Sequence, residues 1–194
     1  LCFHEFAHAY IAYIRGDKTA FHEGRLTLNP INHLDPIGTL MILFVGFGWA
    51  KPVPVNPANL FNKESDMMKV AFAGPASNLI LAMVSGTIMR ISLSNYINLP
   101  ENGWEILFYF TYINIMLAIF NLLPIAPLDG SQIFGSLISR KYPNIAWKLQ
   151  IYGPKVLLGL IIFGLVTNMS IIHIIMSPFI KFFLYLFTGQ SFGL

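Results

Sequence analysis

Two histidines stand four residues apart near the start of this 194-residue chain, with a glutamate directly after the first. They are His4 and His8, and the glutamate is Glu5. In a helix, positions i and i+4 lie on one face, so both imidazoles can reach a single metal ion. A glutamate beside such a pair is typical of zinc hydrolases, in which it serves as general base. This spacing therefore predicts metal-assisted hydrolysis.

The chain around this motif is unusually apolar. Hydrophobic residues make up 55% of it and charged residues 11%, whereas a typical soluble domain has about 25% charged residues. The mean hydropathy is +0.62. These values predict an integral membrane protein. The net charge of +3 comes without a basic run, which argues against a nucleic-acid partner.

The hydrophobic pattern predicts an all-α, polytopic helix bundle that forms one membrane-embedded domain over residues 1–194. The chain begins inside an apolar stretch, so we expect the N-terminal part of its first helix to be missing. Longer apolar stretches predict three further spans, at 70–89, 106–127 and 156–180.

A short strand or re-entrant segment is expected after the first helix. Residues 25–28 alternate like a strand. Residues 37–50 are apolar but too short to cross a bilayer, since a span needs about 20 residues.

The distribution of lysine and arginine predicts the orientation. Residues 51–69 and 128–155 carry them, whereas the loop 93–105 has none. Positively charged loops stay on the cytoplasmic side of a membrane. We therefore expect a multi-pass protein of the cell membrane with His4 and His8 towards the cytoplasmic side.

A catalytic zinc ion needs a third protein ligand and a fourth position left for water. The candidates are His22, His33, Asp35, Asp129 and His173. Asp129 follows an apolar span that two prolines interrupt. An ionisable residue at such a depth is costly and is a functional candidate for that reason.

Two motifs together resemble the site-2 protease family of intramembrane zinc metalloproteases. They are His4-Glu5-x-x-His8 and Asn121-x-x-Pro124-x-x-x-x-Asp129-Gly130. Gly24-Arg25-Leu26-Thr27-Leu28-Asn29-Pro30 and Gly74-Pro75-Ala76-Ser77-Asn78 are similar to short bacterial members without an appended regulatory domain.

The resemblance implies Zn²⁺ as cofactor, with His4, His8 and Asp129 as its ligands and Glu5 as the catalytic glutamate. For Asn121 it implies a role in positioning the substrate or stabilising the oxyanion. We keep Asn78 as a substrate-binding candidate, with helix packing as the alternative role.

The predicted function is hydrolysis of peptide bonds in or near transmembrane segments of membrane-anchored proteins. The partners are thus a membrane-anchored substrate and the lipid bilayer, and the oligomeric state is left open. A substrate that has unwound locally could pair by strand addition with residues 25–28 or 51–57. The alternatives are a non-proteolytic scaffold and a metal transporter. The intact Glu5 argues against the first, and the lack of an inverted repeat argues against the second.

Overall fold

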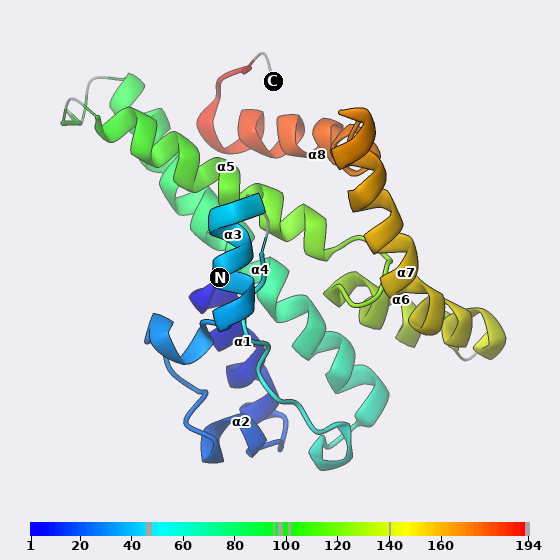
Figure 1. The fold of residues 1–194 in the computed structure, drawn as a ribbon. Coiled ribbons are helices and arrows are strands. Elements are labelled where there is room, and N and C mark those ends of the chain that lie inside the picture. Colours follow the sequence, from blue (N-terminus) through cyan, green and yellow to red (C-terminus); the bar gives the residue numbers. More distant parts are fainter. Residues whose placement is uncertain (46–47, 95, 97–98, 101, 140, 193–194) are drawn as a thin grey trace. The chain divides into compact units, whose positions relative to one another are not determined.

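The computed structural model describes residues 1–45, 48–94, 96, 99–100, 102–139 and 141–192, and most of them are helical. The chain divides into two compact units, Leu1–Ser77 and Asn78–Leu194. The division falls inside one long helix, α4 (Figure 1).

The first unit is made of short helices joined by long loops. α1 packs on α2 and on the single turn η1. The elements of this unit are α1 (Cys2–Ile14), α2 (Thr19–His22), η1 (Pro30–His33), α3 (Pro36–Val45), η2 (Pro57–Asn59) and the beginning of α4 (Lys63–Leu93).

A buried carboxylate holds the loops of this unit together. Asp17 is fully buried just after α1 and accepts hydrogen bonds from the backbone N–H of Asn56 (2.7 Å) and the amide of Asn59 (3.0 Å). Thr19 donates to it with its hydroxyl and its backbone N–H. Burial by itself raises the pKa of Asp17, but these hydrogen bonds outweigh burial and hold the pKa below its ordinary 3.8.

The strand predicted at residues 25–28 is wrong, because the structure has a bend there. The side chain of Arg25 turns inward and donates to the carbonyl oxygen of Lys51 at 2.7 Å. The segment that it contacts contains Pro52 and Pro54, which have no N–H to offer a strand ladder.

The re-entrant segment predicted at residues 37–50 is not supported either. Its described part begins with α3, a regular helix that ends at Val45, and residues 46–47 lie outside the described residues. Within the described ranges, the strand-like pairing amounts to a single antiparallel bridge between Leu34 and Ala50.

The second unit consists of long helices. Four of the described helices, α4, α5, α7 and α8, are long and apolar enough to cross a membrane, which confirms the predicted all-helical, multi-pass protein. After α4 the elements are α5 (Gly103–Asn121), α6 (Asp129–Ser139), α7 (Pro143–Thr167) and α8 (Ile171–Thr188).

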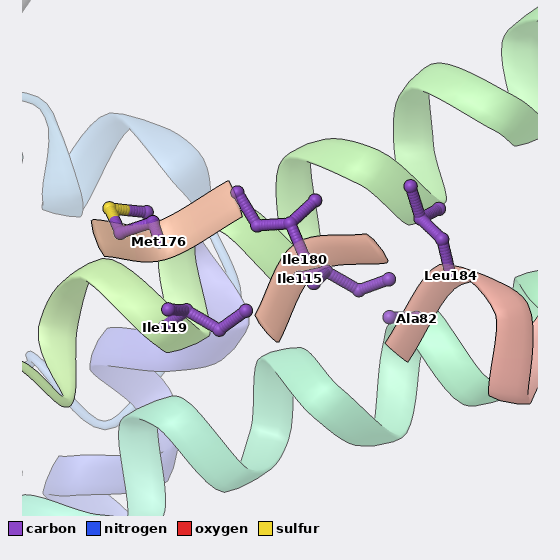
Figure 2. Close-up of a cluster of buried hydrophobic side chains, with 6 residues drawn as sticks. All are labelled: Ala82, Ile115, Ile119, Met176, Ile180 and Leu184. Atoms are coloured by element: carbon purple, nitrogen blue, oxygen red, sulfur yellow. The ribbon is translucent and has the colours of Figure 1, made fainter. Parts of the chain in front are cut away.

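Apolar packing between α4, α5 and α8 forms the core of the second unit (Figure 2). Each of the six side chains in this core is at least nine-tenths buried. They are Ala82 of α4, Ile115 and Ile119 of α5, and Met176, Ile180 and Leu184 of α8. The side of α5 that faces α8 is thereby fixed.

The single span predicted at 156–180 is wrong, because α7 and α8 divide it. α7 ends at Thr167, and Asn168, which caps it, has a left-handed backbone (φ 54°). Ser170 then caps α8 by accepting a hydrogen bond from the backbone N–H of His173 at 3.1 Å. The two helices leave this turn in different directions (Figure 1). Asparagine and serine are suited to such turns, so these two polar residues were the signal for the break.

Candidate metal centre

One face of α1 carries the predicted chemical residues, and that face is buried. His4, Glu5 and His8 are 4%, 9% and 7% exposed. The buried residues recur at intervals of three and four, as one helix face requires. The exposed positions of the same helix are apolar and include Phe3, Tyr10 and Ile14. A helix that hides its polar residues and exposes its apolar ones is suited to lipid surroundings.

The two histidines lie next to each other, and the tautomer of one is defined. Their ring centroids are 4.6 Å apart and the ring planes are nearly perpendicular. Nδ1 of His8 lies 2.7 Å from the carbonyl oxygen of Val70. Because a carbonyl oxygen only accepts, Nδ1 carries the proton and Nε2 keeps the lone pair that a metal ligand needs.

Gly74 of α4 lies directly against the histidine pair. A Cβ atom added there would lie 2.6 Å from both Cε1 and Nε2 of His4, and closer still to Nε2 of His8. Any side chain at this position would therefore occupy the space beside the imidazole nitrogens. Two adjacent imidazoles, one held by a backbone carbonyl and both facing a glycine, fit the requirements of a zinc ion.

The carboxylate of Glu5 is held by a backbone N–H that the sequence analysis missed. Val53 donates to its Oε2 at 2.9 Å. Residues 51–56 are neither helix nor strand, and Val53 stands between Pro52 and Pro54. A lone N–H between two prolines was the available signal, since neither proline can donate.

Four of the five candidates for the third ligand lie in other surroundings. His22 and His173 are exposed. His33 is buried, and its Nε2 donates to the carbonyl oxygen of Thr27 at 2.7 Å. Asp35 accepts from the backbone N–H of Gly38 at 2.7 Å. These two residues therefore hold the loop around η1.

The fifth candidate, Asp129, is the first residue of α6 and is half-buried. The turn before it is tightly packed. A Cβ atom at Gly130 would collide with the carbonyl oxygens of Leu122 and Leu123, and one at Gly153 of α7 would lie 2.6 Å from the backbone nitrogen of Ala126. The start of α6 is thus fixed by glycines that allow the backbone to approach closely.

The two asparagines predicted at the site are both on helices of the second unit. Asn121 ends α5 and donates its side-chain amide to the carbonyl oxygen of Leu117 at 2.9 Å. Asn78 is fully buried in α4. The structure thus brings His4, Glu5 and His8 together in the first unit, while Asn121 and Asp129 flank one turn of the second. The completion of the metal centre by Asp129 stays a prediction.

Comparison with known proteins places this chain in a class. Residues 83–163 match the model of Peptidase family M50, and this range contains Asn121 and Asp129. "Putative zinc metalloprotease YwhC" of Bacillus subtilis is 45% identical over 146 residues, which cover 70% of this chain and 64% of that protein.

Two further relatives carry similar names. "Zinc metalloprotease MJ0392" of Methanocaldococcus jannaschii is 28% identical over 92% of this chain and 44% of that protein. "Putative zinc metalloprotease Rip2" of Mycolicibacterium smegmatis is 30% identical over 67% of this chain and 51% of that protein. The chain thus spans between 44% and 64% of the length of these three relatives. No solved structure matches.

These matches place the chain in Peptidase family M50, and they confirm the predicted resemblance to site-2 proteases. Together with the four membrane-competent helices, they support a multi-pass membrane protein of this family.

Proposed function

We propose that this protein is a zinc-dependent endopeptidase that cuts membrane-anchored proteins in or near their transmembrane segments. The observation that carries the proposal is the buried face of α1, where His4, Glu5 and His8 lie together on a helix whose other side is apolar. A base and two metal ligands at a lipid-exposed helix suit substrates that are themselves in the membrane. The whole chain acts as one metalloprotease domain in this proposal.

The ligands in the proposed centre are His4, His8 and Asp129, which is the donor set that the family resemblance implies. Two imidazoles and a carboxylate are a set that catalytic zinc uses, with a fourth position left for water. When bound, zinc supplies Lewis acidity that lowers the pKa of a bound water towards about 7 and polarises the scissile carbonyl.

The protein's own residues move the protons. Val53 holds Oε2 of Glu5, so Oε1 is the atom that takes the proton of the attacking water and returns it to the leaving nitrogen. His8 keeps its orientation through Val70. Asn121, whose amide also donates to Leu117, and Asn78 are the proposed contacts for the substrate carbonyl.

The proposal does without strand addition. Residues 25–28 form no strand, and residues 51–57 contain three prolines. The backbone N–H groups of Lys51, Val53 and Asn56 are already donated to His33, Glu5 and Asp17. Few backbone N–H groups of this segment are therefore left to pair with a substrate backbone.

The orientation is part of the proposal. Lysines at 51–69 and 128–155, with none at 93–105, support an active site towards the cytoplasmic side of the cell membrane. Substrates would then release their cytoplasmic part after cleavage.

The test is co-expression of the wild type and Glu5→Gln with candidate single-span proteins, followed by mass spectrometry of the fragments. We expect Glu5→Gln to retain zinc and lose cleavage, because it keeps the shape of the side chain but cannot take a proton. Asp129→Ala should lose most of its zinc. A Glu5→Gln variant that still cleaves would show that Glu5 is not the general base. Full zinc content in Asp129→Ala would show that Asp129 is not a ligand.

The same experiment separates the alternatives. A scaffold would bind zinc and cut nothing in either form. A transporter would move zinc into vesicles without producing fragments.

A further inference from the structure

Residues 51–56, which we name the proline segment, are held at four places by other residues of the first unit. Lys51 donates its backbone N–H to the carbonyl oxygen of His33 at 2.9 Å. Asn56 donates its own to Oδ2 of Asp17 at 2.7 Å. Arg25 and Glu5 make the other two contacts, between these ends.

The contact with Arg25 is a buried one. Its side chain is 6% exposed, and one guanidinium nitrogen donates to the carbonyl oxygen of Lys51 at 2.7 Å and to that of Pro52 at 3.4 Å. A hydrogen bond from a charged donor is stronger than a neutral one. Arg25 therefore fixes the two peptide groups that come immediately before Val53.

The contact with Glu5 is the reason why this fixing matters for chemistry. Val53 N–H lies 2.9 Å from Oε2 of Glu5. Between residues 52 and 54 it is the sole backbone donor, because Pro52 and Pro54 lack an N–H. Prolines also restrict the backbone, so the direction of this N–H is well defined.

We propose that the proline segment positions the general base, and that Arg25 is a positioning residue for peptide hydrolysis that acts through Val53. This inference rests on the proposed function. The chain of contacts runs from Arg25 to the carbonyls of Lys51 and Pro52, then through Val53 N–H to Oε2. It leaves Oε1 of Glu5 for proton transfer, a step in which misplacement by about 1 Å can cost about 100-fold in rate.

The contact can be tested without any catalysis, by amide hydrogen exchange of the proline segment in the zinc-loaded protein. Glu5→Ala removes the acceptor, so we expect Val53 to exchange about 10- to 100-fold faster than in the wild type. Glu5→Gln keeps an acceptor oxygen, so the exchange rate of Val53 in this variant should stay close to that of the wild type. The amides of Lys51 and Asn56 are internal controls, because His33 and Asp17 still protect them. Equal exchange at Val53 in wild type and Glu5→Ala would overturn the contact.

The effect on catalysis is tested by two matched pairs. Val53→Pro removes the N–H, whereas Val53→Ala keeps it and shortens only the side chain. We expect kcat of Val53→Pro to be about 10- to 100-fold below that of Val53→Ala, with the same KM and zinc content. Arg25→Met removes every side-chain donor at that position and should lower kcat. Arg25→Lys should restore part of the lost kcat, because its side chain donates again.

The outcomes separate the inference from the proposed function. If the wild type cleaves and the members of each pair have equal kcat, the positioning role is wrong while the protease stands. A change in KM or zinc content equal to the change in kcat would show a purely structural segment and would also overturn the inference. If the wild type cleaves nothing, the proposed function fails, and hydrogen exchange alone decides whether Val53 holds Glu5.

Discussion

The two compact units of this protein are stabilised in opposite ways. The first, Leu1–Ser77, has short helices and buries charged side chains such as Asp17 and Arg25 among backbone hydrogen-bonding groups. The second, Asn78–Leu194, has long helices around an apolar core. Its buried hydroxyls, such as those of Ser85 and Thr188, donate to carbonyls of their own helices.

This difference follows from the task of each unit: the second packs helices together, and the first orients the side chains of α1. Lipid gives no hydrophobic driving force between helices, so the second unit depends on close packing of side chains. The side chains of α1 need a defined direction instead. Directional hydrogen bonds give it: His8 donates to the carbonyl oxygen of Val70, and Glu5 accepts from the backbone N–H of Val53. We therefore expect substitutions in the first unit to change zinc content or the polar network, and substitutions in the second to change packing.

Gly74→Ala should give the largest loss, because its Cβ would occupy the space beside the nitrogens of His4 and His8. We expect zinc content and cleavage to fall to near background. Gly159→Ala is the matched control, since a Cβ at Gly159 in α7 meets nothing within 4 Å. Metal analysis of both purified variants measures the effect, and a fully zinc-loaded Gly74→Ala would refute the close approach.

Ile115→Ala should damage the apolar core of the second unit. It opens a cavity among Ala82, Ile119 and Ile180, at an expected cost on the order of 3 kcal/mol. Ile106 lies on the same helix but is 67% exposed, against 0% for Ile115, so Ile106→Ala is the control. Thermal unfolding in detergent gives the comparison, and equal midpoints for the two variants would contradict the packing.

Asp17→Asn should loosen the first unit by about 1–3 kcal/mol, because hydrogen bonds to a charged acceptor are lost or weakened. The pKa of Asp17 lies below its ordinary 3.8, so the stabilisation is present at neutral pH. It disappears as the pH falls through the lowered pKa, where the folded protein must take up a proton.

The wild type should therefore lose more thermal stability than Asp17→Asn when the pH falls below about 4. Glu23→Gln, at an exposed position of the same region, is the control and should follow the wild type. Parallel pH curves for wild type and Asp17→Asn would remove Asp17 from the polar network.

Ser170→Ala should have the smallest effect, a loss of about 1 kcal/mol, because it removes the side-chain cap of α8. Cleavage and zinc content should stay as in the wild type. Ser94→Ala, at an exposed serine near the end of α4, is the comparison. A Ser170→Ala midpoint that coincides with that of Ser94→Ala would show that the cap contributes nothing.

Much of this organisation was predictable from local patterns. The length of the apolar runs predicted α4 and α5. The spacing of His4, Glu5 and His8 predicted that these side chains share one face of α1, because that signal depends on the helical period alone. The assignment of Asp129 still depends on a resemblance. Its proposed role as a third ligand joins residues that are far apart in sequence, which no local pattern encodes.

The errors have physical causes too. Residues 25–28 alternate like a strand, but a strand needs a partner, and the neighbouring proline segment cannot be one. The long stretch at 156–180 looked continuous because hydropathy averages over Asn168 and Ser170, whereas helix ends depend on single residues. Val53 was missed, and Gly74 was known only as part of a motif, because a backbone N–H and an absent side chain leave little trace in residue type.

The break at Asn168–Ser170 also decides the parity of membrane crossings. A single helix over 156–180 would be one crossing and would leave the two ends of that stretch on opposite sides of the bilayer. α7 and α8 are each long and apolar enough to cross, and two such crossings would make an even number. Two crossings would return the residues after Thr188 to the compartment from which α7 starts, so a reporter fused beyond α8 would sit on the same side as Lys141.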